Sequence, residues 1–159
     1  IKLLSFDTII LDLDFTIWDG CKPLFWARLL EAPYKLDNNK FYGKSEEYIQ
    51  LQDGISDVLD ILFKNGKNIG FASRGAADNI EYFMQPTIIA LQSFRIYGYF
   101  TYQKILVHRT VNKAELLKPS GKTIYIDDNP TDLEQVSLIH GGKIEIINRN
   151  AFNNWRSIL

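Results

Sequence analysis

The segment TIILDLDFTIWD, residues 8–19, decides how the rest of the chain is interpreted. It begins with a short run of β-branched and apolar residues, which is typical of a strand buried on both faces of a parallel sheet. We expect this strand at residues 8–13. It ends in two acidic residues, Asp12 and Asp14, and Thr16 follows them. Polar groups at the end of a buried strand are the first candidates for a functional site.

Strand-like and helix-like segments alternate over the rest of the chain. The apolar periodicity predicts helices at residues 55–63, after Ser73, and at 87–94, 113–118 and 130–139. It predicts further strands at 67–72, within 98–107, at 123–127 and at 143–147. We expect Pro86 to separate the helix after Ser73 from the helix at 87–94, because proline lacks an N–H. This alternation predicts a three-layer, Rossmann-like α/β fold with a parallel sheet, formed as one domain over residues 1–159.

Composition and charge exclude several classes of partner. Lys and Arg number 18 against 19 for Asp and Glu, so the net charge of -1 provides no general attraction for nucleic acids or anionic membranes. No apolar run approaches the roughly 20 residues that span a bilayer, and the first residues lack the pattern of a signal peptide. The single cysteine, Cys21, cannot form an intrachain disulfide. We therefore expect an intracellular, cytoplasmic protein.

Polar side chains follow three of the predicted strands, and the ends of parallel strands meet at one edge of a sheet. These side chains are Asp12, Asp14, Thr16, Ser73, Arg74, Asp127 and Asp128. The carboxylates among them would repel one another unless a cation lay between them. Oxygen ligands of this kind suit Mg²⁺, so we expect magnesium as the cofactor.

Three segments resemble sequence motifs of the haloacid dehalogenase (HAD) superfamily. LDLDFTIWD resembles the first motif, FASRG the second and YIDDNPTD the fourth, and the resemblance covers residues 9–147. The chain is most similar to the small, cap-less, magnesium-dependent phosphatases of this superfamily. The resemblance implies a hydrolase that acts on phosphomonoesters through an aspartyl-phosphate intermediate.

The same resemblance assigns roles to the residues that match these motifs. Asp12 would be the nucleophile, and Asp14 would protonate the leaving group and then activate water, which requires a pKa above the usual value of about 3.9. Thr16 and Ser73 would bind the phosphoryl group. Arg74 would either anchor the substrate phosphate or cap a helix.

The metal ligands implied by the resemblance are the carboxylates of Asp12 and Asp128 and the backbone carbonyl of Asp14. Asp127 would orient its neighbours, and Asp132 matches an outer acidic position of the family.

The lysine of the third motif is open between two candidates. Lys113 lies near the start of a short predicted helix before the fourth strand, and Lys104 is the alternative. If neither lysine reached the site, a noncatalytic interaction module that keeps the HAD fold would be the better interpretation. A phosphoacceptor receiver domain also uses clustered aspartates, but in receivers an acidic pair comes first and a lone acceptor aspartate later. In this chain the order differs, since Asp12 and Asp14 come first and the adjacent pair Asp127 and Asp128 comes last.

Residues 18–52 have no sustained period and are rich in aromatic side chains, so we interpret them as an insertion after the first motif. The insertion is too short for a separate cap domain. We therefore expect an open site that accepts a phosphoprotein or another accessible phosphomonoester. The insertion also supplies candidates for substrate contact: Tyr34, Lys35, Lys40, Tyr42 and Lys44. The sequence leaves the natural substrate and the oligomeric state open.

Overall fold

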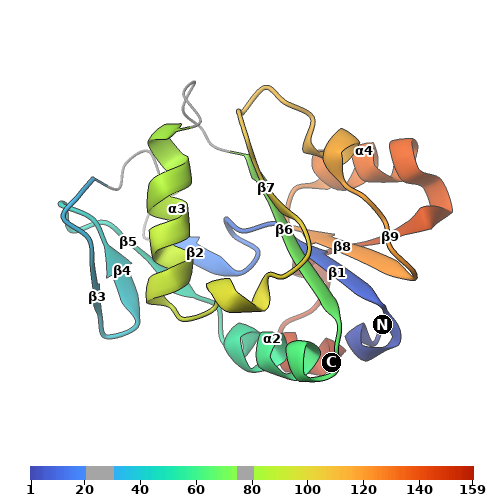
Figure 1. Ribbon diagram of the computed structural model, residues 1–159, viewed down its shortest axis with the longest axis horizontal. Helices are drawn as coiled ribbons and strands as arrows, with labels where there is room; N and C mark the ends of the chain where they lie inside the picture. The colour runs from blue at the N-terminus through green and yellow to red at the C-terminus, as the bar shows by residue number, and fades with distance from the viewer. Residues whose placement is uncertain (21–30, 75–80) are drawn as a thin grey trace.

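A five-stranded parallel sheet forms the centre of the protein (Figure 1). The computed structural model describes residues 1–20, 31–74 and 81–159, with the backbone alone for residues 81–85. The strands are β1 (Thr8–Leu11), β6 (Asn68–Arg74), β7 (Lys104–Val107), β8 (Thr123–Asp127) and β9 (Ile144–Asn148). Their order across the sheet is β7-β6-β1-β8-β9, with every neighbouring pair parallel. The predicted α/β class and the Rossmann-like parallel sheet are confirmed.

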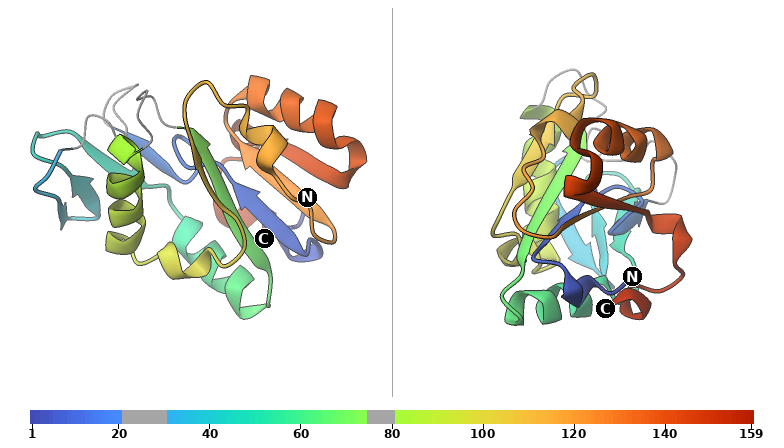
Figure 2. Two further views of the ribbon diagram at one scale, coloured as in Figure 1. Left: turned by 45° about the horizontal axis from the view of Figure 1, so that its top comes forward. Right: turned by 90° about the vertical axis from the view of Figure 1, so that its right-hand side faces the viewer.

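Helices and short 3₁₀ turns flank this sheet. The α-helices are α2 (Ile55–Lys64), α3 (Glu81–Ser93) and α4 (Pro130–His140). The 3₁₀ turns are η1 (Leu3–Ser5), η2 (Tyr97–Tyr99), η3 (Lys113–Leu116), η4 (Gly141–Lys143), η5 (Arg149–Ala151) and η6 (Trp155–Ile158). No helix in the described part of the chain could cross a bilayer, since the longest of them, α3, has 13 residues. The two chain ends lie side by side (Figure 2), where the Leu4 amide donates to the Leu159 carbonyl.

The alternation of side chains along β1 divides the core into two clusters. Ile9 and Leu11 are buried in a cluster that includes the apolar face of α2 and the buried Trp155 of η6. Ile10 points to the other face, where it joins Leu133 and other residues of α4 and η3. Both faces of β1 are therefore covered, which explains why its sequence is an unbroken apolar run.

The start of α4 is fixed directly beside the end of β8. The side chain of Asn129 accepts a hydrogen bond from the Thr131 amide at 2.9 Å, so it caps the helix, and Pro130 occupies the first turn. Only Asp128 separates this cap from the last residue of β8. The chain reversal therefore holds two adjacent aspartates at the edge of the sheet.

The insertion forms a second sheet of four short antiparallel strands. They are β2 (Trp18–Gly20), β3 (Lys35–Asp37), β4 (Lys40–Tyr42) and β5 (Tyr48–Leu51), in the order β2-β5-β4-β3. Figures 1 and 2 show this sheet at one end of the molecule, beside α3. The buried ring of Phe41 packs between Tyr34 and Phe94, with ring centroids 5.5 and 6.2 Å away. The sequence did not predict these strands, because three or four residues are too few for the alternation of apolar and polar side chains to be recognised.

Several predicted element bounds are wrong. The first strand ends at Leu11 rather than at residue 13, and the helix predicted at 113–118 is the short 3₁₀ turn η3. Pro86 does not separate two helices but lies inside α3. A missing N–H removes one backbone hydrogen bond, and the part of α3 after Pro86 is held against the core by the buried Ala90 and Leu91. The second predicted strand continues two residues further than expected, so Ser73 and Arg74 end β6 rather than follow it. Ser73 is therefore not a helix cap in the described residues, and Cys21 and Ile80 lie outside them.

Gly70, in the middle of β6, tests how tightly the parallel sheet packs. A Cβ there would lie 2.8 Å from the backbone carbonyl oxygen of Gln103, so Gly70→Ala forces two backbone segments apart. We expect a loss of about 1–3 kcal/mol in the free energy of unfolding. The matched control is Gly98→Ala, where a Cβ would meet nothing within 4 Å. Equal urea midpoints for the two variants would contradict the packing seen at β6.

Candidate functional site

The ends of β1 and β8 meet where the order of the sheet reverses. The chain builds outward from β1 through β6 to β7 and then returns to the other side of β1 with β8. In open α/β sheets ligands bind at this switch point, outside the carboxyl ends of the strands. Asp12 follows β1, its amide bonds to the Ile126 carbonyl of β8 at 2.9 Å, and Asp127 ends β8. The topology therefore gathers the predicted aspartates at a place suited to binding.

Lys113 lies at the centre of this cluster. Its ammonium is 2.7 Å from Asp12 Oδ1 and 2.9 Å from Asp127 Oδ2, and the residue is only 2% exposed. It also donates to the Ala72 carbonyl of β6 at 3.2 Å. Lys104, the alternative, is exposed and places its ammonium over the ring of Tyr97. Of the two candidate lysines, the structure brings Lys113 to the aspartates.

The charges in the cluster depend on one another. Burial alone would lower the pKa of Lys113, but the carboxylates of Asp12, Asp127 and Asp132 together raise it, so the lysine stays charged. Burial raises the pKa of Asp12, and the Lys113 ammonium opposes this shift. Burial and the neighbouring Asp127 also raise the pKa of Asp128. A single buried ammonium faces several carboxylates, so it does not balance all of their negative charge. The remaining charge would favour the binding of a second cation.

Asp127 is held by hydrogen bonds at both of its oxygens. The Asn129 amide donates to Oδ1 at 2.9 Å, while Oδ2 accepts from the Tyr125 hydroxyl and faces Lys113. Burial, followed by the nearby Asp127 carboxylate, raises the pKa of Tyr125, so its hydroxyl remains a donor. Tyr125 is not among the site residues predicted from the sequence, although a tyrosine in an apolar strand indicates a hydroxyl that needs a buried partner.

The turn after β1 carries Asp14 in a constrained conformation. Phe15 adopts a positive φ of 60°, which is unfavourable for a bulky side chain and typical of functional sites. The Trp18 indole donates to Asp14 Oδ1 at 2.8 Å. Burial raises the pKa of Asp14 to about 6, against the opposing effect of this hydrogen bond. This is the direction required of a carboxyl that both gives and takes a proton.

Thr16 completes the turn beneath the aspartates. Its hydroxyl is fully buried and donates to Asp12 Oδ2 at 3.1 Å. Because the lysine contacts Oδ1, both oxygens of Asp12 are oriented by the protein.

Ser73 and Arg74, at the end of β6, reach the same region in different ways. Ser73 is buried, and its hydroxyl makes no hydrogen bond to another described residue. Arg74 Nη2 lies 2.5 Å from both oxygens of Asp132, whose Oδ2 is 3.8 Å from Lys113. Arg74 is therefore held by an ion pair in this structure, and Asp132 belongs to the charge network of the site.

All of the predicted site residues except Thr16, which is fully buried, line an open hollow of about 400 Å³, which we call the site hollow. Its walls include Asp12, Asp14, Ser73, Arg74, Lys113, Asp127, Asp128 and Asp132, together with Phe15, Arg109 and Asn129. The sequence analysis assigned no role to the last three. Arg109 follows β7, so its place after a parallel strand is the signal that could have identified it. Of the insertion candidates Tyr34, Lys35, Lys40, Tyr42 and Lys44, all of them described residues, none lines the hollow.

The acidic cluster could hold a metal ion. One carboxylate oxygen from each of Asp12, Asp127 and Asp128 lies within 4.8 Å of the others. Oxygen ligands of this charge and spacing could hold a hard divalent cation.

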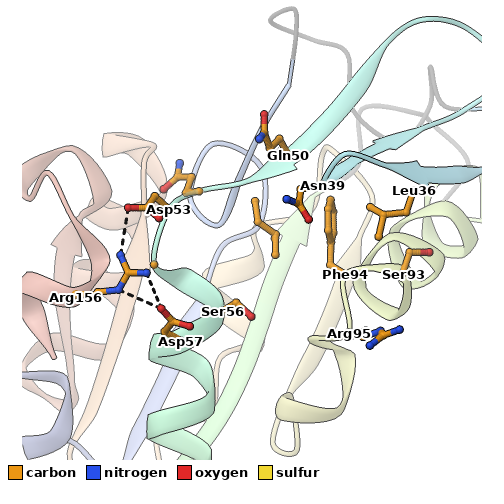
Figure 3. Close-up of a pocket in the computed structure, with 13 residues that line it drawn as sticks. Leu36, Asn39, Gln50, Asp53, Ser56, Asp57, Ser93, Phe94, Arg95 and Arg156 are labelled. Atoms are coloured by element: carbon orange, nitrogen blue, oxygen red, sulfur yellow. Dashed lines mark hydrogen bonds and ion pairs between the residues drawn. The ribbon is translucent and has the colours of Figure 1, made fainter.

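A second hollow, of about 740 Å³, lies between the start of α2, the end of α3 and the antiparallel sheet (Figure 3). Arg156 crosses one side of it and pairs with Asp53 at 3.2 Å and Asp57 at 2.6 Å. It shares no lining residue with the site hollow and lacks its buried, unbalanced carboxylates. The chemistry therefore points to the smaller hollow.

Comparison with known proteins adds no assignment: no protein-family model matches the chain, and no curated protein matches it. The function must be argued from the residues and geometry of the site.

Replacing Lys113 by Met tests the charge balance without any assay of activity. Removing one partner of a buried ion pair costs about 3–5 kcal/mol of folding free energy, because the remaining carboxylates stay buried without their cation. We expect this loss for Lys113→Met in urea unfolding at pH 7 without divalent ions. Lys104→Met, at an exposed lysine, should change stability by about 0.5 kcal/mol or less. Similar losses in the two variants would show that Lys113 does not balance the cluster.

Proposed function

We propose that this protein is a Mg²⁺-dependent phosphomonoester hydrolase of the HAD superfamily that forms an aspartyl-phosphate on Asp12. The observation that carries the proposal is the buried Lys113 ammonium between Asp12 and Asp127 at the switch point of the sheet. A carboxylate nucleophile needs a fixed orientation and a nearby positive charge, and the contacts of Asp12 supply both.

In the first half-reaction, a carboxylate oxygen of Asp12 attacks phosphorus and the bond to the ester oxygen breaks. The Asp14 carboxyl gives its proton to the departing oxygen, so the product leaves as a neutral alcohol. A pKa of about 6 keeps part of the Asp14 population protonated near neutral pH. Lys113 balances the negative charge that gathers on Asp12 and the phosphoryl group.

In the second half-reaction, the Asp14 carboxylate takes a proton from water, and the water oxygen attacks phosphorus. The bond between phosphorus and Asp12 breaks, which releases inorganic phosphate and restores the Asp12 carboxylate and the Asp14 carboxyl. The same side chain serves both halves, as microscopic reversibility suggests. The Ser73 hydroxyl, which lines the site hollow, could donate to a phosphoryl oxygen, whereas the buried Thr16 hydroxyl donates to Asp12 Oδ2 and would orient the nucleophile.

Mg²⁺ suits the oxygen ligands of this cluster, with the carboxylates of Asp12 and Asp128 and the backbone carbonyl of Asp14 as its protein ligands. Bound there, the ion would reduce the repulsion between the Asp12 carboxylate and the phosphate dianion. The resemblance gives Asp127 an orienting role, and the hydrogen bonds that it accepts from the Tyr125 hydroxyl and the Asn129 amide suit that role. Its carboxylate nevertheless lies close enough to those of Asp12 and Asp128 to be a further ligand.

The open site hollow favours a substrate whose phosphate is carried on a large or accessible molecule, such as a phosphoprotein. A cytoplasmic location agrees with the single cysteine. The alternative of a noncatalytic module with this fold was favoured by doubt over the third-motif lysine. The contact between the Lys113 ammonium and Asp12 supports the enzyme over this alternative.

The test of the nucleophile is Asp12→Asn, assayed with an aryl phosphate in Mg²⁺ and again in EDTA. We expect turnover by the wild type in Mg²⁺ only, a fall to background in Asp12→Asn, and a beryllofluoride adduct on Asp12 in the wild type alone. Asp37→Asn, an exposed aspartate on β3, is the matched control and should retain activity. Metal-independent turnover, or full activity in Asp12→Asn, would refute the mechanism.

The metal ligands are tested by titrating the protein with Mg²⁺ in an isothermal calorimeter, which measures the affinity. Asp128→Asn removes one negative charge from the cluster, so we expect Mg²⁺ affinity to fall about tenfold or more, within the range known for changes around metal sites. Asp57→Asn removes the same charge at the second hollow and should leave affinity unchanged. Equal affinities in all three proteins would place the ion elsewhere.

A further inference from the structure

The side-chain amide of Gln52 joins the turn that carries Asp14 to two other parts of the molecule. Its Nε2 donates to the Phe15 carbonyl at 3.2 Å and to Asp19 Oδ1 at 3.0 Å. Its Oε1 accepts from Arg149 Nε at 2.5 Å and from the Trp155 indole at 3.0 Å. The orientation of the amide follows from its partners, since two can only accept and two can only donate. Both N–H groups of the amide donate a hydrogen bond, and its oxygen accepts two.

The backbone of Gln52 also bonds to the turn. Its amide donates to the Ile17 carbonyl at 2.9 Å, and the preceding residue, Leu51, pairs with Trp18 across the antiparallel sheet. Trp18 in turn bonds Asp14 through its indole and accepts from the Phe15 amide at 2.8 Å through its carbonyl. The end of β5 therefore contacts the turn at two carbonyls, those of Phe15 and Ile17.

These contacts fall on the one residue of the turn that is conformationally unfavourable. A positive φ at a phenylalanine costs on the order of 1–2 kcal/mol and persists only where surrounding contacts enforce it. The Phe15 amide is bound by Trp18 and its carbonyl by Gln52, so both of its polar backbone groups are held. Asp14 immediately precedes this residue, and its direction follows from the conformation of the turn.

The far side of the Gln52 amide is anchored in the C-terminal segment. Arg149 Nη1 donates to the Phe152 carbonyl at 2.6 Å, and its guanidinium lies over the rings of Phe152 and Trp155. Trp155 is fully buried in the core that includes α2. The Gln52 amide is thus bonded on its far side to groups packed against the core, which gives it a fixed point from which to hold the turn.

From these contacts we infer that Gln52 is a positioning residue: it fixes the Phe15 turn and thereby aims the Asp14 carboxyl into the site hollow. The inference rests on the proposed function for the role of Asp14. The contact itself, between the residue that follows β5 and the turn after β1, does not depend on that function and can be tested separately.

Gln52→Glu is the most selective variant. A carboxylate of the same shape keeps the acceptor bonds to Arg149 and Trp155, but it loses both donor bonds and repels the Phe15 carbonyl and Asp19. Gln50→Glu is the matched control, because Gln50 is exposed on β5, two residues before Gln52, and pairs with Asp19 across the sheet. The control adds the same charge near the same aspartate without touching Phe15.

The first readout is the indole ¹H–¹⁵N signal of Trp18, which reports the hydrogen bond to Asp14 without any substrate. The chain has three tryptophans, and Trp18→Phe assigns the signal. We expect the signal to move in Gln52→Glu and to stay unchanged in Gln50→Glu. A Trp18 signal in Gln52→Glu that coincides with the wild type would overturn the inference.

The second readout is steady-state kinetics with an aryl phosphate and Mg²⁺. Because the turn aims the acid and base rather than binding phosphate, kcat should fall by about tenfold to a hundredfold while KM stays within about twofold. An unchanged kcat in an otherwise active protein would overturn the positioning role. If the wild type has no phosphatase activity, the proposed function fails, and the indole signal alone decides whether Gln52 holds the turn.

A measurement on the wild type covers the case in which Gln52→Glu does not fold. Both side-chain amide hydrogens of Gln52 are donated, so they should exchange with solvent more slowly than those of the exposed Gln50. Equal exchange rates would show that the Gln52 contacts do not persist in solution, which would overturn the inference.

Discussion

The ion pairs of Lys113 with Asp12 and Asp127 are the interactions on which the site depends. The sheet order makes β1 and β8 neighbours, so their terminal carboxylates are forced together in a buried place. Buried carboxylates without a cation would cost several kcal/mol or would take up protons. Lys113 offsets this cost from η3, a short turn whose own position is set by packing against α4 and β6. The negative charge that remains is what makes the edge of the sheet suitable for a second cation.

The turn after β1 is the second constraint, and the antiparallel sheet supports it. Trp18, on β2, donates to the Asp14 carboxyl, and Gln52, which directly follows β5, donates to the Phe15 carbonyl. The insertion therefore has a structural role at the site, although its lysines and tyrosines do not line the site hollow. A small sheet that carries two of the contacts to the turn explains how Phe15 keeps a positive φ.

The central strands could be predicted because burial on both faces leaves a strong local signal. β1 and β8 are buried on both faces, and an aspartate stands at the end of each run. A buried carboxylate is costly unless it is paired, so these aspartates stand out as candidate site residues. The insertion had no such signal, since its strands have three or four residues and bury only a few side chains, such as Phe41. The break predicted at Pro86 was wrong because tertiary packing outweighs the loss of one helical hydrogen bond.

The sequence by itself determined the α/β class and the identity of the acidic residues, because both depend on local patterns within a few positions. It could not choose between Lys104 and Lys113, and it could not show that Arg74 pairs with Asp132 or that Gln52 reaches Phe15. Those contacts join residues 101, 58 and 37 positions apart. Only the order of the strands and the packing of the turns between them decide which distant side chains meet, because a charge or hydrogen bond acts over a few ångströms of space and not along the chain.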